Sequence, residues 1–147
     1  MPQFTHTHRV QFAETDMAGI VHFANFYRYM EETEHAFFRS LGFSIVDKQP
    51  DGTVIGWPRV RATCSFEAPA YYDDILEIDL EVTRQGVKSL TMGFVFRRGE
   101  QRLATGELKT CCCLYQPGGK FHSIEIPPTH REKLESASAD PKGANGE

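Results

Sequence analysis

Residues 12–42, FAETDMAGIVHFANFYRYMEETEHAFFRSLG, decide the fold of this chain. The stretch opens as the end of a β-like run that stops at Glu14, bends through the polar segment 15–19, and turns helical from about Asn25. Gly42 stands where a left-handed helix cap is favoured. The helical part advances by steps of 4, 3, 4 and 4, the repeat of one helix face, through Phe26, Met30, Thr33, Phe37 and Leu41.

Asp16 lies in the bend just ahead of the helix start. The first N–H groups of a helix have no partners within it, and the helix dipole makes that end partly positive. Such an end can hold an anion, or the oxyanion that forms when a carbonyl is attacked. A carboxylate beside an oxyanion site is suited to acyl transfer. The commoner role of an Asp in a turn is structural, and the position alone does not decide between the two.

The composition is that of an ordinary globular protein. The chain has 147 residues, enough for one domain with a core, and 40% are hydrophobic and 24% charged. A net charge of -4 and a pI near 5.9 give no reason to expect a nucleic-acid partner. No apolar run reaches membrane-spanning length, and the N-terminus lacks the apolar core of a signal peptide. We therefore expect a cytoplasmic protein with no membrane partner.

Alternating apolar residues predict strands along the rest of the chain. The segment 59–68 alternates most strictly, so we expect one packed and one polar face there. The segment 43–58 is rich in Gly and Pro and is predicted to be a connection with turns. Short turns separate the later strands, which favours a mostly antiparallel sheet. The predicted strands are 8–14, 59–68, 75–83, 88–97 and 102–115.

About five strands, with one long helix between the first two, make an α+β fold. The helix has an apolar stripe rich in Phe, which favours a curved sheet wrapped around it. Residues 1–135 are expected to form this single domain. Residues 136–147, SASADPKGANGE, are polar and contain Gly and Pro, so we expect a disordered tail.

The cysteines and histidines predict no metal site. Cys111, Cys112 and Cys113 would alternate between the faces of a strand, so they cannot converge on one ion. The histidines have no convergent spacing. We expect these three cysteines and Cys64 to be small buried side chains in a reducing compartment.

Residues 16–31, DMAGIVHFANFYRYME, carry a resemblance to a known family. They fit the pattern D-x-A-G-I-V-x-x-x-N-[FY]-x-R-[YWF]-[ML]-[DE], and so the segment resembles the signature of hotdog-fold acyl-CoA thioesterases of the 4-hydroxybenzoyl-CoA thioesterase-like branch. Further matches follow at 65–74, 88–89 and 124–127, so the resemblance covers about residues 8–128. It implies a hotdog fold, in which the sheet wraps around the helix. It also implies hydrolysis of an acyl-CoA substrate to free CoA and a carboxylic acid, without a cofactor.

The resemblance assigns the chemistry to the loop ahead of the helix. Asp16 would be the catalytic carboxylate, acting either as the nucleophile on the thioester carbonyl or as the base that activates water. The backbone N–H of Phe23, seven residues later, would point at the thioester oxygen. Gly19 would supply the backbone freedom that the loop needs.

Other matched positions imply contacts with the substrate. His22 precedes the oxyanion donor and either faces the site or is an ordinary surface or half-buried histidine. Glu31 and Trp57 match positions that line the acyl pocket of the hydroxybenzoyl enzyme, where the residue matching Trp57 is smaller. The acyl group of the substrate, aromatic or aliphatic, therefore stays open. Lys88 and Ser89 match residues near the CoA phosphates, where a cation and a hydroxyl suit a polyanionic tail.

Two alternative functions remain on the same fold. A dehydratase or hydratase acting on acyl thioesters would need a histidine paired with a carboxylate across the site, and His22 is the candidate nearest to Asp16. A non-catalytic acyl-CoA-binding protein would have no need of Asp16.

The resemblance and the exposed sheet also imply self-association. One helix covers only one side of such a sheet, so we expect at least a homodimer, and the family often forms homotetramers. In a symmetric dimer we expect Asp16 of one chain to lie near residues 57–63 of the other.

Overall fold

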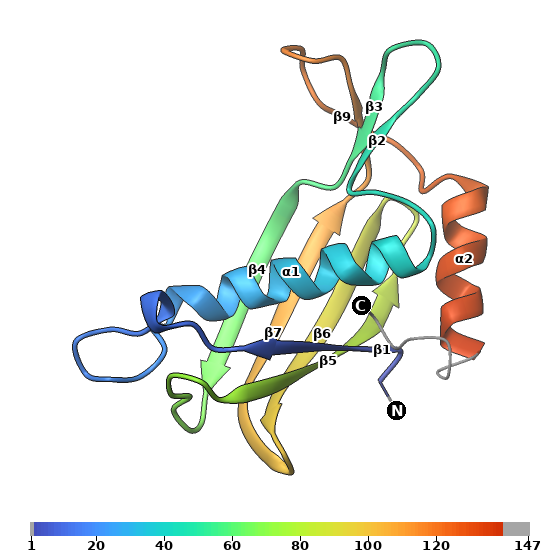
Figure 1. Ribbon diagram of the computed structural model, residues 1–147. Coiled ribbons are helices and arrows are strands. Elements are labelled where there is room, and N and C mark those ends of the chain that lie inside the picture. Colours follow the sequence, from blue (N-terminus) through green and yellow to red (C-terminus); the bar gives the residue numbers. More distant parts are fainter. Residues whose placement is uncertain (1, 140–147) are drawn as a thin grey trace.

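The structure, a computed structural model, describes residues 2–139. Its main sheet has five strands in the order β1-β5-β6-β7-β4, and every neighbouring pair is antiparallel. Helix α1 (Ala24–Ser40) lies across one face of this sheet (Figure 1). The predicted α+β hotdog fold is therefore confirmed. The strands are β1 (Phe4–Arg9), β5 (Ile75–Gln85), β6 (Ser89–Arg98), β7 (Gln101–Cys111) and β4 (Arg59–Phe66).

The core fills the space between α1 and the sheet. The predicted helix face is buried at Phe26, Met30, Thr33 and Phe37, and Gly42 has the expected left-handed φ of +86°. At Gly106, in β7, a β-carbon would collide with the sulfur of Met30, so the absence of a side chain lets the helix approach the sheet. The sheet contributes Leu76, Ile78, Leu80, Leu90, Met92, Phe94 and Phe96 to the same core.

The first strand of the sheet begins and ends earlier in the sequence than the predicted strand at 8–14. β1 ends at Arg9, and residues 12–14 of the predicted strand form a 3₁₀ turn, η1 (Phe12–Glu14). The side chain of Glu14 accepts a hydrogen bond from the Gln11 N–H at 2.6 Å, which favours a turn over an extended strand. Phe12 is consequently 77% exposed instead of buried.

A second, smaller sheet has the order β2-β3-β8-β9, with antiparallel neighbours. The predicted connection at 43–58 thus contains two strands, and the predicted long strand at 102–115 is two strands interrupted at Cys112. Cys112 stands where the chain passes from one sheet to the other: its N–H donates to the Lys88 carbonyl at 2.7 Å, and its carbonyl accepts the Ile124 N–H at 2.9 Å. The strands are β2 (Val46–Lys48), β3 (Val54–Gly56), β8 (Cys113–Tyr115) and β9 (His122–Ser123).

The chain continues as helix α2 (Pro128–Ala139), which packs beside the end of α1 (Figure 1). Leu134 is fully buried and Ala137 packs against the core. The expected disordered tail therefore does not begin at 136, and its remainder, 140–147, lies outside the described residues. Neither helix in the described part of the chain is long and apolar enough to cross a membrane.

Strand β4 is the outer edge of the main sheet, and the structure corrects the expectation of a packed face there. Val60 is 61% exposed and Phe66 is 49% exposed, although the pattern placed both on the buried side. The reason is that β4 is an edge strand, with β7 on one side and an open edge on the other within one chain. The strand leaves an apolar surface open along its edge.

Candidate active site

The loop that carries Asp16 is a closed turn. The Asp16 N–H donates to the Ile20 carbonyl at 2.8 Å, and the Gly19 N–H donates to the Asp16 carbonyl at 2.9 Å. An isolated bridge between Thr15 and Val21 closes the base of the turn. Gly19 has a φ of +81°, a left-handed conformation that a side chain would strain. The backbone therefore holds the Asp16 carboxylate in a defined place.

Asp16 opens onto a cavity of about 450 Å³ at the start of α1. Its Oδ1 accepts the Ala18 N–H at 2.9 Å, and it forms no ion pair with any residue in the range 2–139. Glu67, the other carboxylate in the wall, is paired with Arg102 at 2.8 Å. Of the two carboxylates in the cavity wall, Asp16 is therefore the one without an ion-pair partner that a bound ligand would meet. The rest of the wall is Phe23 with Ile20, Val21, Phe26, Phe66, Ala68, Pro69 and Ala70.

The helix start supplies a free hydrogen-bond donor to the same cavity. Phe23 is the N-cap residue of α1, and no side chain caps the helix there. The Ala24 N–H is taken by His22 Nδ1 at 3.2 Å, while the Phe23 N–H has no partner in the described part of the chain. Because Phe23 and Asp16 line one cavity, a carbonyl oxygen bound there can meet a backbone donor beside a carboxylate.

Asn25 ties the start of the helix to the preceding turn. It lies inside α1, is 9% exposed, and its Nδ2 donates to the Glu14 carbonyl at 2.7 Å. The side chain fastens the helix to the turn that precedes the Asp16 loop. The cap position falls on Phe23, whose side chain cannot accept a hydrogen bond. The Asn25 and Phe26 N–H groups donate to the His22 and Phe23 carbonyls, so the donor left open at the helix start, among the described residues, is the Phe23 N–H.

His22 lies next to the cavity but not in its wall. Its exposed ring stacks on Phe23 with the ring centroids 4.8 Å apart, and its Nδ1 is occupied by the Ala24 N–H. The residues that line the cavity include no histidine.

The remaining candidate residues lie away from Asp16 within one chain. Trp57 is buried, with its ring centroid 5.4 Å from that of Phe38, and Glu31 is exposed on α1. Lys88 lies in the turn between β5 and β6, and Ser89 is the first residue of β6. This turn lies at the opposite end of α1 from the loop that precedes the helix (Figure 1). A single chain therefore brings Asp16, Gly19 and Phe23 together, but not the other four.

The segment from Phe66 to Ala70, which forms much of the cavity wall, received no role from the sequence. Its signal was present, because this bend lies within the motif at 65–74, but a motif does not show which side chains face a cavity. Val21 N–H donates to the Ala70 carbonyl at 2.8 Å, and this bond brings the bend against the Asp16 loop.

A second buried carboxylate lies on α1. Glu34 is fully buried, and its Oε1 lies 2.7 Å from Arg59 Nη2. The contact lacks hydrogen-bond geometry, and Glu34 Oε2 finds no hydrogen-bond partner within residues 2–139. Burial raises the pKa of Glu34 to about 7, against the opposing effect of Arg59, while the charge of Glu31 adds to the rise. This group does not line the cavity.

The chain matches the family described as Thioesterase superfamily over residues 18–105. The crystal structure of a hypothetical protein from Aquifex aeolicus is similar with a TM-score of 0.77 and 31% identity, covering 89% of this chain and 98% of that one. A gentisyl-coenzyme A thioesterase structure is similar with a TM-score of 0.74 and 31% identity, covering 86% and 98%. The 4-hydroxybenzoyl-CoA thioesterase of Pseudomonas sp. (strain CBS-3) is 26% identical over 133 residues, covering 84% of this chain and 92% of that protein.

A sheet wrapped on one helix, with a carboxylate loop and an open helix start on one cavity, is the arrangement of a hotdog thioester hydrolase. The chain belongs to the thioesterase superfamily.

Proposed function

We propose that this protein hydrolyses an acyl-CoA thioester, with Asp16 as the catalytic carboxylate and the Phe23 N–H as the oxyanion donor. The observation that carries the proposal is the single cavity that both residues line. An unpaired carboxylate beside a free helix-start N–H combines the two elements that attack on a carbonyl requires: a nucleophile or base, and a donor for the negative oxygen.

These groups allow two chemically balanced routes for hydrolysis of the thioester. In the first, an Asp16 oxygen attacks the thioester carbonyl, the C–S bond breaks, and CoA leaves as a thiolate that takes up a proton; water then hydrolyses the mixed anhydride. In the second, Asp16 accepts a proton from water as the water oxygen attacks, and the proton passes to the leaving thiolate. Both routes give a carboxylic acid and free CoA, and in both the Phe23 N–H stabilises the tetrahedral oxyanion.

The cavity wall favours an aromatic acyl group. Phe23, Phe26 and Phe66 line the cavity, and aromatic rings pack on one another in offset or edge-to-face geometry. The gentisyl and 4-hydroxybenzoyl thioesterases are named for ring-hydroxylated aromatic acids, which supports the same class of substrate for this chain.

A symmetric dimer would complete the site. If two β4 strands paired edge to edge about a twofold axis near the middle of the strand, Arg59 of one chain would lie beside Phe66 of the other, because the strands would run antiparallel. Phe66 lines the cavity of Asp16, so the segment from Trp57 onward would come from the second chain. We propose that this pairing supplies the missing contacts from Glu31 and Trp57, with Lys88 and Ser89 holding the CoA phosphates.

The two alternative functions have less support. A dehydratase would need a histidine in the cavity wall, and the residues that line the cavity include none. A binding protein would have no use for an unpaired carboxylate beside an oxyanion donor.

A panel of aromatic and aliphatic acyl-CoAs, assayed for free thiol, tests the proposal. We expect release of CoA, fastest from hydroxylated aromatic acyl groups. Hydration products without thiol would show the dehydratase class instead, and binding without any turnover across the panel would show the binding class.

A further inference from the structure

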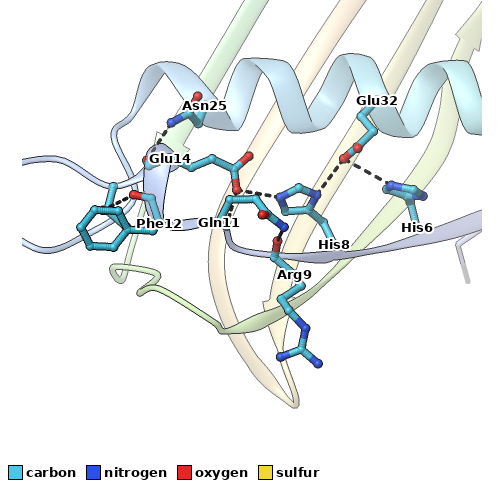
Figure 2. Close-up of polar contacts among 9 residues, drawn as sticks. His6, His8, Arg9, Gln11, Phe12, Glu14, Asn25 and Glu32 are labelled. Carbon is cyan, nitrogen blue, oxygen red and sulfur yellow. Dashed lines mark hydrogen bonds and ion pairs between the residues drawn. The ribbon is translucent and has the colours of Figure 1, made fainter.

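A cluster of charged and aromatic side chains lies between β1, η1 and the first turns of α1, beside the Asp16 loop (Figure 2). His8 is at its centre. Its Nε2 lies 2.9 Å from Glu14 Oε1, and its Nδ1 lies 3.0 Å from Glu32 Oε2. The His8 side chain is 13% exposed, and its ring packs on Tyr29 with the centroids 4.4 Å apart. The imidazole is therefore held between two carboxylates with little access to water.

The contacts of His8 with the two carboxylates depend on its protonation. Ionised carboxylates accept hydrogen bonds and cannot donate them. The contact of Nε2 with Glu14 has hydrogen-bond geometry, whereas the contact of Nδ1 with Glu32 has the distance of an ion pair without that geometry. A neutral imidazole carries no charge toward either carboxylate, whereas the imidazolium attracts both and has an N–H on each nitrogen. Burial acts to raise the pKa of Glu14, but hydrogen bonds from the Gln11 N–H and from His8 outweigh it and hold that pKa below its ordinary value. Glu14 thus remains an acceptor, and the bridge is complete only with cationic His8.

Glu14 connects this bridge to the active site. Its carbonyl accepts the His22 N–H at 2.9 Å and Asn25 Nδ2 at 2.7 Å. These bonds hold the chain on both sides of Phe23, the oxyanion donor, while Asp16 follows Glu14 by two residues. A displacement of Glu14 would therefore change the separation between the carboxylate and the donor.

The other titratable groups that face His8 do not replace its charge. His6 Nε2 lies 3.3 Å from Glu32 Oε2, but among the described residues His6 forms no ion pair with Glu14, so it does not join the two carboxylates. Burial, with the charges of Glu14 and Glu32, raises the pKa of Tyr29, so its hydroxyl stays neutral. His8 is the ring that contacts both carboxylates.

We propose that His8 is a positioning residue for thioester hydrolysis, whose imidazolium bridges Glu14 and Glu32 and so fixes the placement of Asp16 against the Phe23 N–H. The inference rests on the proposed function of Asp16 and Phe23. Because His8 does not line the cavity, loss of its proton lowers kcat and leaves KM nearly unchanged.

The test is the pH dependence of kcat and KM, from about pH 5.5 to about pH 9, across the range where histidine titrates. His8→Arg keeps a permanent cation whose planar fork can donate to both carboxylates and pack on Tyr29. His8→Gln keeps one donor and no charge. His122→Gln, at an exposed position in β9, is the matched control.

We expect kcat of the wild type and of His122→Gln to fall by about tenfold toward high pH, the scale of a small displacement of catalytic groups. His8→Arg should keep its kcat over the same range, and His8→Gln should have a low kcat throughout. An identical high-pH decline in the wild type and in His8→Arg would overturn the proposal.

Nitrogen NMR of the His8 ring in the wild type gives a readout that needs neither a variant nor turnover. We expect both ring nitrogens to be protonated at the pH of maximal kcat, and a neutral ring at that pH would overturn the proposal. Asp16→Asn is assayed alongside. Full turnover by Asp16→Asn would refute the proposed function, while the NMR result would still decide whether the bridge exists.

Discussion

The carboxylates of Asp16 and Glu34 are suited to different roles because their surroundings differ. Asp16 is half-buried in a tight turn, has no ion pair among the described residues, and lines a cavity beside a free N–H. Glu34 is fully buried on α1, and Arg59 compensates its burial only in part. The first arrangement suits chemistry with a ligand, and the second affects stability.

Glu34→Gln should stabilise the protein above neutral pH. Its pKa is raised from 4.5 to about 7, so between these values the folded chain holds a proton that the unfolded chain has released, and stability falls as pH rises. The free energy of unfolding of Glu34→Gln, minus that of the wild type, should grow across this window by on the order of 3 kcal/mol. Urea unfolding at a series of pH values measures this difference. A constant difference would mean that Glu34 is ionised throughout.

Lys88→Ala should raise KM for acyl-CoA with little change in kcat, because a phosphate contact far from the carbonyl binds ground state and transition state alike. The increase should shrink as salt is added. Steady-state kinetics at low and high salt provide the measurement, with Lys120→Ala, at another exposed lysine, as the control. An unchanged KM at low salt would remove Lys88 from the CoA site.

Among the elements, the helix and the central strands could be predicted because their residues obey one period each. Phe26 to Phe37 follow the helical repeat, and Leu76 to Leu80 alternate in β5 with full burial. The sequence prediction failed where a side-chain hydrogen bond overrides the alternating pattern. Phe12 alternates like a strand residue, yet the hydrogen bond between Glu14 and Gln11 turns the chain there.

The residues of the candidate site also divide into those that the sequence predicted and those that it did not. Asp16, Gly19 and Phe23 belong to one local motif, so the sequence predicted their proximity. The bend at 66–70 reaches the cavity through the hydrogen bond between Val21 and Ala70. These two residues are 49 positions apart in the sequence, so no local pattern indicates their contact. His8 was similarly missed, because its two carboxylate partners lie on η1 and α1.

Gly106→Val should destabilise the fold by about 1–3 kcal/mol, the usual effect of adding methyl groups to a packed core. A β-carbon there would collide with Met30 and would also approach the Thr63 carbonyl at 3.2 Å. Gly93→Ala in the neighbouring strand β6 is the control, because its β-carbon would meet mainly a methyl group of Thr83. Thermal unfolding compares the two, and equal shifts would contradict close packing of α1 on Gly106.

For the whole molecule, the open edge of β4 is the feature that a single chain leaves unexplained. An exposed strand edge with apolar side chains is a template for pairing with a second chain. Val60 and Phe66 are exposed on this edge strand, and Phe66 also lines the Asp16 cavity. We therefore expect assembly and activity to depend on the same strand.

Val60→Lys should weaken the dimer and reduce activity in parallel, because each of the two paired β4 edge strands would then carry a lysine. Val46→Lys, at a 50% exposed position in β2, is the control and should leave both unchanged. Sedimentation and activity are measured over the same dilution series. A fully active monomer would contradict the shared site, even with the hotdog fold intact.

The central claim is that Asp16 carries out thioester hydrolysis, and the rate of CoA release by Asp16→Asn tests it most directly. The substitution keeps the size of the side chain and can still accept the Ala18 N–H, so the fold and acyl-CoA binding should survive. We predict that kcat falls by roughly 100-fold or more, the scale expected for a positioned base or nucleophile. A kcat near that of the wild type, in a variant shown to bind acyl-CoA, would contradict the assignment.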